Sequence, residues 1–168
     1  LTSETIKNDF LHTGDIGEID KDGFLKITDR KKQLFKTSGG KYIAPQVIEN
    51  KMKRSPFIEQ IMVIGEGEKM PSALIQPDFV YIKNWLKKNK FNYLDDFKNI
   101  CKNEELLIKI SEEINKINEK FGDWERIKKF ELTPQIWSIE NGLLTPTMKL
   151  KRKSILKKFI HLKEKIYI

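Results

Sequence analysis

The chain alternates apolar and polar residues over several short stretches, as strands do. Residues 16–29 contain two alternating runs around a turn with the sequence Asp22-Gly23. Because an Asp-Gly pair supplies the positive φ of a tight turn, these residues are predicted to form a β-hairpin. Residues 58–65 and 72–77 are rich in strand-forming residues and flank a turn of Gly, Glu and Lys, so they are predicted to pair as neighbouring strands.

Helical spacing of apolar residues dominates the middle of the chain. Pro45 stands where a helix is expected to begin, and that helix should continue to Arg54. Apolar residues three and four apart predict further helices near 79–90, 94–102 and 104–121. The last of these carries one apolar stripe, expected to be a buried face, that consists of Leu106, Leu107, Ile110, Ile114, Ile117 and Phe121.

The remaining predicted elements are short. Extended segments are expected at residues 33–36 and 41–44, a further strand at 126–133, and a basic helix at about 151–165. This order of strands and helices predicts an α+β fold, in which helices pack on a small mixed sheet.

The first 29 residues differ from the rest of the chain in how large a hydrophobic core they can form. Residues 33–168 are expected to make one domain of ordinary size. Residues 1–29 have too little apolar surface to fold alone, so we expect them to be the end of a larger N-terminal domain, with residues 30–32 as the hinge. The chain starts at Leu1 without an initiator methionine, which indicates a fragment.

The composition is that of a folded globular protein. Of the 168 residues, 39% are hydrophobic and 33% are charged, and no apolar run approaches the roughly 20 residues that span a bilayer. Cys101 is the one cysteine, so an intrachain disulfide and a C-x-x-C metal or redox site are both excluded. A reducing, cytoplasmic setting fits this cysteine usage.

The net charge of +8 has two possible explanations: the protein binds an anionic partner, or the excess lysines lie on an ordinary solvated surface. Most of the excess lies in lysines scattered among Asn, Ile and Glu, which is typical of a solvated helix surface. Aromatic residues are not interleaved with basic residues on one predicted face, as a nucleic-acid stacking platform would require. We therefore expect no nucleic-acid partner, and a basic module for nucleic acid or an anionic membrane surface is the rival hypothesis.

Two clusters in the first part of the chain carry candidate chemistry. Asp15 ends a Thr-Gly-Asp segment before the hairpin, where its carboxylate can accept two hydrogen bonds from a vicinal diol such as a ribose. A turn cap is the alternative explanation. The segment Ser38-Gly39-Gly40-Lys41 offers backbone N–H groups beside a cation, which suits a phosphate or a narrow ligand passing the main chain. A simple Gly-Gly turn explains the same residues.

A third cluster lies near the C-terminus, where the sequence reads LTPTMKLKRK. A lysine on a mobile loop can neutralise the negative charge that builds up on a phosphate during acyl or phosphoryl transfer. Lys149 and Lys151 are both candidates for this role. A basic cap of the following helix is the alternative.

In this order and spacing, the three clusters resemble the adenylate-forming superfamily of acyl-CoA synthetases, luciferases and nonribosomal peptide adenylation domains. The segment HTGDIGEIDKDGFLKITDRKKQLFKTSGGKYIAPQVIE is especially similar to the long-chain acyl-CoA synthetases, and LTPTMKLKRKSIL resembles their C-terminal lysine motif. The resemblance covers nearly the whole chain. It implies the C-terminal portion of a long-chain fatty acid–CoA ligase, with a small mobile domain that rotates between two half-reactions.

The resemblance also implies the reaction and its cofactors. A fatty acid attacks the α-phosphate of Mg-ATP to give an acyl-adenylate and pyrophosphate, and coenzyme A then displaces AMP to give acyl-CoA. The metal site, the phosphate loop, the adenine pocket and the acyl tunnel of this family belong to the large N-terminal domain. We therefore expect no metal site in this chain and no synthetase activity from the chain alone.

Site residues follow from the positions that match the family motifs. Asp15 and Arg30 are expected to contact the ribose of ATP, and Lys32 is expected to be the hinge residue. The loop from Ser38 to Lys41 is expected to face the pantetheine arm of coenzyme A. Lys149 is expected to contact the acyl carboxylate and the α-phosphate during adenylation.

Some alternatives stay open at this point. The family motif commonly reads S-G-K, whereas this chain has Thr147-Met148-Lys149, so Lys151 remains the alternative catalytic lysine. An acyl-AMP ligase that hands its adenylate to a carrier protein is a close alternative to a CoA ligase. Peripheral contact with the inner face of the membrane is a further expectation.

Overall fold

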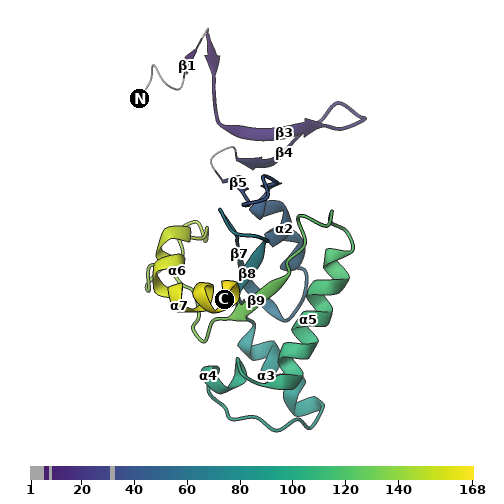
Figure 1. The fold of residues 1–168 in the computed structure, drawn as a ribbon, viewed down its shortest axis with the longest axis vertical. Helices are drawn as coiled ribbons and strands as arrows, with labels where there is room; N and C mark the ends of the chain where they lie inside the picture. Colours follow the sequence, from purple (N-terminus) through teal and green to yellow (C-terminus); the bar gives the residue numbers. More distant parts are fainter. Residues whose placement is uncertain (1–5, 8, 31–32) are drawn as a thin grey trace.

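The computed structural model describes residues 6–7, 9–30 and 33–168 (Figure 1). A small sheet lies at the centre of the molecule, and helices pack on both of its faces. Short paired strands from the N-terminal end project away from it. This arrangement confirms the predicted α+β fold with helices packed on a small mixed sheet.

The central sheet has three strands in the order β7, β8, β9. β7 (Ile58–Ile64) and β8 (Ser72–Pro77) run antiparallel, as predicted for these segments, whereas β9 (Lys129–Leu132) lies parallel to β8. A parallel pair needs a long crossover connection, and three helices supply it here.

One face of the sheet is covered by the helices of the middle region. These are α2 (Pro45–Met52), α3 (Phe79–Lys88), α4 (Phe97–Ile100) and α5 (Glu104–Asn118). Each position of the predicted apolar stripe on α5 is buried or partly buried against the core, which confirms that stripe. The helix predicted near 94–102 is only the four residues of α4, because side-chain caps delimit it closely.

Capping residues fix where three of these helices begin. Asp78, Asp96 and Asn103 precede α3, α4 and α5, and the side chain of each accepts a hydrogen bond from the backbone N–H three residues further on. Such a cap contributes about 1 kcal/mol to helix stability. The caps before α4 and before α5 therefore confine α4 to a single turn.

Two helices, α6 (Arg152–Lys158) and α7 (Ile160–Tyr167), cover the other face. The single helix predicted at about 151–165 is therefore wrong: the chain breaks at Phe159, with φ −112° and ψ 29°. Phe159 is buried, and its ring stacks on the ring of Trp137 with 6.3 Å between the two ring centres. The break turns α7 onto β9, where the backbone carbonyl of Ile166 accepts a hydrogen bond from Lys129 at 2.8 Å.

Successive residues of the long strands enter two separate hydrophobic clusters. Ile61, Val63 and Ile75 pack in the cluster under α2, α3 and α5, whereas Met62 and Leu74 pack in the cluster under α6 and α7. The alternation follows from the pleat of a strand. Burial on both faces explains why these strands read as nearly continuous apolar runs.

The predicted hairpin is confirmed by β3 (Asp15–Ile19) and β4 (Leu25–Arg30), which pair antiparallel. In the connecting turn, Oδ1 of Asp20 accepts hydrogen bonds from two backbone N–H groups, and Gly23 has φ +85°. Apart from the half-buried Ile16, the apolar side chains of the hairpin are exposed, with Phe24 at 71%. In Figure 1 the hairpin projects from the sheet-containing part of the molecule.

The other N-terminal elements are two-residue strands. β1 (Ile6–Lys7) pairs with β2 (Phe10–Leu11), and β5 (Phe35–Lys36) pairs with β6 (Tyr42–Ile43). The pair β5–β6 matches the predicted extended segments. The predicted hinge residue, Lys32, lies outside the described residues, and the division into two domains stays a prediction.

Candidate functional site

The two residues predicted to contact a ribose lie opposite each other in the hairpin. Asp15 and Arg30 are paired positions in the β3–β4 ladder, at the end remote from the turn. The side chain of Asp15 is half-buried, and its backbone N–H donates to Oγ1 of Thr13 at 3.2 Å. Because paired residues of antiparallel strands are close neighbours, one ligand can lie within reach of both positions.

The Gly-Gly loop, residues 37–41, is a closed turn between β5 and β6. The backbone N–H of Thr37 donates to the carbonyl of Lys41 at 3.0 Å, and that of Gly40 donates to Thr37 at 2.9 Å. Gly40 has φ +82°, a conformation that glycine adopts without strain. The N–H of Ser38 donates to the carbonyl of Glu68 at 2.9 Å, which ties the loop to the turn between β7 and β8.

These hydrogen bonds distinguish between the two uses predicted for the loop. The N–H groups of Ser38 and Gly40 are committed to backbone carbonyls, so they do not form a ready cradle for a phosphate. Gly39 is different, because a Cβ atom at this position would meet no atom within 4 Å. The main chain at Gly39 is therefore open to a ligand that approaches it from this side.

Cations and aromatic rings flank the Gly-Gly loop. Nζ of Lys41 lies 5.5 Å from the ring centre of Trp124, whose side chain is 52% exposed, and Nζ of Lys36 lies 5.4 Å from the ring centre of Tyr42. Trp124 follows α5 and is remote in sequence from the loop, so the pattern of residues around the loop does not predict its pairing with Lys41. The fold brings the ring of Trp124 next to the Gly-Gly loop.

The lysine loop, residues 144–150, is also closed on itself. Leu144 and Leu150 form a β-bridge, and the backbone N–H of Thr145 donates to the carbonyl of Lys149 at 2.8 Å. In return, the N–H of Lys149 donates to Oγ1 of Thr145 at 3.0 Å. The side chain of Lys149 is left exposed on a well-defined loop.

Met148 adopts the left-handed conformation in this loop, with φ 60°. Its N–H donates to the carbonyl of Thr145 at 2.8 Å, which closes the turn. A non-glycine residue in this conformation costs roughly 1–2 kcal/mol. The position at which the related motif commonly has glycine is thus one where the backbone favours glycine.

An ion pair with a buried carboxylate anchors the chain just after the lysine loop. Nη2 of Arg152 donates to both carboxylate oxygens of Glu49 at 2.6 and 2.8 Å, and Nη1 donates to the carbonyl of Val63 at 3.3 Å. Oε1 of Glu49 also accepts a hydrogen bond from the N–H of Val63 at 2.7 Å. The side chain of Glu49 is only 7% exposed. This network joins α2, β7 and α6, and sequence reasoning did not find Arg152.

The lysine loop borders two hollows. Lys149 lines a polar hollow of about 250 Å³ over α2 and β7, together with Gln46 and Asn50, whereas Lys151 does not line it. Met148 lines both this hollow and a larger one of about 630 Å³. No residue of the Gly-Gly loop lines either of these two hollows.

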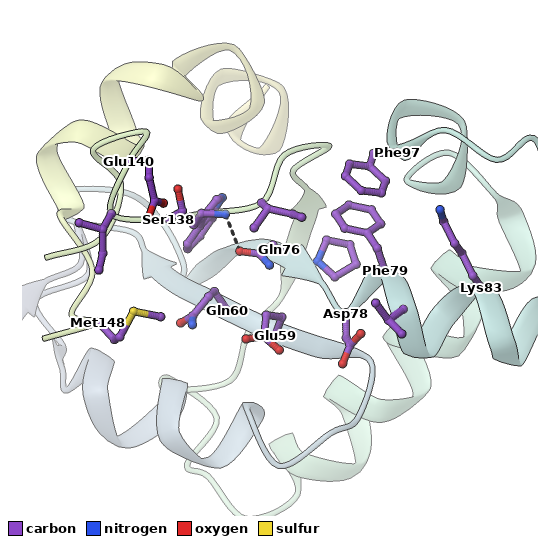
Figure 2. Close-up of a pocket in the computed structure, with 15 residues that line it drawn as sticks. Glu59, Gln60, Gln76, Asp78, Phe79, Lys83, Phe97, Ser138, Glu140 and Met148 are labelled. Atoms are coloured by element: carbon purple, nitrogen blue, oxygen red, sulfur yellow. Dashed lines mark hydrogen bonds between the residues drawn. The ribbon is translucent and has the colours of Figure 1, made fainter. Parts of the chain in front are cut away.

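Figure 2 shows the larger hollow, with Met148 and Gln60 on one side and the stacked rings of Phe79 and Phe97 on the other. Its floor is fixed by Gln76, whose Oε1 accepts a hydrogen bond from the backbone N–H of Trp137 at 2.7 Å. Most of the exposed lining surface is apolar. Any group that packs here lies beside the lysine loop.

Two further properties concern the described residues as a whole. Within residues 6–7, 9–30 and 33–168, no three histidine, cysteine or acidic side chains gather into a group that could hold a metal ion. In the same part of the chain, no helix is both long enough and apolar enough to cross a membrane.

Comparison with known families supports the resemblance found in the motifs. Residues 32–168 match the family described as AMP-binding enzyme C-terminal domain. The chain is 35% identical to long-chain-fatty-acid–CoA ligase FadD15 of Mycobacterium tuberculosis, over 99% of this chain and 28% of that protein. It is 41% identical to human long-chain-fatty-acid–CoA ligase 1, over 90% of this chain and 22% of that protein. The chain thus spans about a quarter of the length of these relatives.

Solved structures share the fold. The adenylation domain of a carboxylate reductase from Mycobacterium chelonae superimposes with a TM-score of 0.79 at 21% identity, over 99% of this chain and 24% of that one. The corresponding domain from Segniliparus rugosus, solved with AMP and a co-purified carboxylic acid, gives 0.78 at 24% identity, with the same coverage of 99% and 24%.

Proposed function

The chain belongs to the family of AMP-binding enzyme C-terminal domains, and from this membership we propose that it is the C-terminal part of a long-chain fatty acid–CoA ligase. The whole enzyme would join a fatty acid to coenzyme A at the expense of ATP, through an acyl-adenylate, with release of AMP and pyrophosphate. A large N-terminal domain would be the partner of this chain. It would hold the Mg²⁺ that accompanies ATP, as well as the fatty acid.

The observation that carries the proposal is the closed loop that presents Lys149. Its backbone is fixed by hydrogen bonds to Thr145, and the ion pair between Arg152 and Glu49 anchors the following helix to the sheet. A cation held in this way can stabilise negative charge on a carboxylate and a phosphate with little reorganisation. Lys149 would therefore serve the adenylation step, and Lys151, which does not line the adjoining hollow, would not.

The Gly-Gly loop would serve the second step. The open space at Gly39 lets the pantetheine arm of coenzyme A pass the main chain, and Lys41 stands beside it as a cation for the phosphates. Asp15 and Arg30, paired in the hairpin, would hold the ribose of the nucleotide. Because the Gly-Gly loop does not line the hollow beside Lys149, the domain would turn between the steps to present each loop in its turn, with Lys32 in the hinge.

Two variants of the full-length ligase test the assignment of the lysine. Lys149→Ala should lower palmitoyl-adenylate formation by about 10²-fold or more, because a charge that stabilises the transition state is lost. Thioester formation from pre-made palmitoyl-AMP and coenzyme A should stay near the wild-type rate. Pyrophosphate release and acyl-CoA production measure the two steps separately.

Lys151→Ala is the matched control, since it removes another exposed cation two residues away. It should leave both steps near the wild-type rate. Loss of adenylation in Lys151→Ala but not in Lys149→Ala would transfer the role to Lys151. If neither variant changes adenylation, the lysine loop is not part of the active site. Acyl transfer to a carrier protein but not to coenzyme A would favour the acyl-AMP ligase instead.

A further inference from the structure

A hollow of about 570 Å³ opens along the free edge of the sheet, far in sequence from both loops. β9 is the outer strand and pairs only with β8 among the described strands. Residues of α4, α5 and the intervening segment line one side of the hollow, and residues of α7 line the other. Its volume lies within the range of about 300–1,000 Å³ that is usual for small-molecule sites.

The interior of this edge hollow is apolar because it lies between the two hydrophobic clusters. Leu107 and Phe130 pack at the border of one cluster, and Leu162 packs at the border of the other. Each of the three side chains is half-buried. A fourth strand would cover both borders, and no described segment takes that place.

Cys101 forms part of the same interior. Burial, with a smaller contribution from Asp96, raises the pKa of the Cys101 thiol to about 12. The group therefore stays protonated at neutral pH and behaves as a small apolar side chain rather than as a nucleophile. The hollow is a binding surface and not a site of covalent chemistry.

The rim of the edge hollow carries more lysines than acidic residues. Lys98, Lys102 and Lys165 line it, and Glu131 is the one acidic residue among the lining residues. Glu131 is engaged by Lys165 at 2.8 Å. The carboxylate of Asp96 is also near, but it caps α4. Lys98 and Lys102, about one helical turn apart in sequence, are thus left to face an anionic ligand.

We propose that the edge hollow binds a single-chain anionic amphiphile such as a free long-chain fatty acid. The hydrocarbon chain lies along Phe130 and Leu162, and the anionic headgroup lies at Lys98 and Lys102. A flat membrane surface fits less well, because the apolar side chains line a recess rather than a protruding face. The site shares no residue with the Gly-Gly loop or the lysine loop, so it does not depend on the ligase assignment.

The test is a titration of the isotope-labelled 168-residue chain with laurate below its micelle concentration, followed by amide NMR. Saturable shifts should centre on β9, α7 and residues 98–107. Dodecyltrimethylammonium, with the same chain length and a cationic headgroup, should bind at least about tenfold more weakly. Octanoate should also bind more weakly than laurate, because less apolar surface is buried.

Charge reversal separates the edge hollow from general lysine binding. The double variant Lys98→Glu with Lys102→Glu should weaken laurate binding by about tenfold or more. The matched control is Lys87→Glu with Lys88→Glu, at exposed positions in the last turn of α3. It should leave the affinity unchanged. Both variants alter exposed side chains, and unchanged amide spectra outside the altered sites verify the fold.

Several results would overturn the proposal. Equal affinity for laurate and dodecyltrimethylammonium would indicate unspecific detergent binding. Equal loss in both charge-reversal variants would indicate a diffuse effect of net charge. Shifts centred on the hollow beside Met148 would place the ligand elsewhere. Binding to anionic phospholipid vesicles without binding to monomeric laurate would identify a membrane surface instead. None of these outcomes bears on Lys149, whose role is tested by adenylation.

Discussion

The Gly-Gly loop and the lysine loop are both tight turns closed by backbone hydrogen bonds, yet they expose different parts of the chain. The Gly-Gly loop uses glycine at its left-handed position, Gly40, and leaves open space at Gly39. The lysine loop places Met148 at its left-handed position and exposes the Lys149 side chain. We propose that the first loop serves a ligand that passes its main chain and that the second positions a cation.

The loops also differ in what holds them. The Gly-Gly loop is tied to its surroundings by backbone hydrogen bonds, whereas the lysine loop is followed by a buried ion pair between distant residues. Backbone hydrogen bonds permit many sequences, but a buried ion pair requires both partners. The lysine loop should therefore be much more sensitive to a single substitution nearby.

The largest expected effect comes from breaking that ion pair. Arg152→Met removes the two hydrogen bonds and the positive charge that Arg152 supplies to the buried carboxylate of Glu49, and it should destabilise the chain by about 3 kcal/mol. Urea denaturation measures the loss. Adding Glu49→Gln should recover part of it, because the amide still accepts the hydrogen bond from Val63 without a buried charge. Lys151→Met, at the exposed neighbouring position, should change stability by less than about 0.5 kcal/mol.

A loss below about 1 kcal/mol in Arg152→Met would mean that the ion pair does not anchor the loop. The lysine loop would then be no more sensitive to substitution than the Gly-Gly loop. An equal loss in Arg152→Met and Lys151→Met would point to a general effect of charge removal near α6.

A smaller effect is expected in the Gly-Gly loop. Gly40→Ala should destabilise the chain by roughly 1–2 kcal/mol, because alanine is strained at φ +82°. The nearest atom to the added Cβ is the flexible end of Lys36 at 3.7 Å, so crowding adds little. Gly39→Ala is the control: it meets open space without a positive φ, and its stability should change by less than about 0.5 kcal/mol. Equal losses at both positions would contradict this assignment of the strain.

The smallest effect has the opposite sign. Met148→Gly should stabilise the chain by about 0.5 kcal/mol, because relief of the left-handed strain slightly exceeds the backbone entropy that glycine loses on folding. Met148→Ala removes the same side chain but keeps the strain, so it should not stabilise. Thermal unfolding of the two variants gives the comparison. Destabilisation by both would show that contacts of the Met148 side chain outweigh the strain.

Most local structure could be read from the sequence. The hairpin, the pairing of β7 with β8 and the buried stripe of α5 follow from apolar periodicity and turn residues, which act over a few positions. The motifs around Asp15, Ser38 and Lys149 also led to the family, because the order of short motifs is itself a property of the sequence.

The tertiary structure decided what depends on distant partners. Apolar spacing continues through Phe159, so only packing against Trp137 and β9 shows that the helix breaks there. Glu49 and Arg152 are 103 residues apart, and nothing in either local segment predicts their ion pair. The sequence motif offers Lys149 and Lys151 as alternative catalytic lysines, and only the folded loop places Lys149 beside the polar hollow. Periodicity and turn chemistry are local, whereas the pairing of charges and the direction of a side chain are fixed by the packing of the whole domain.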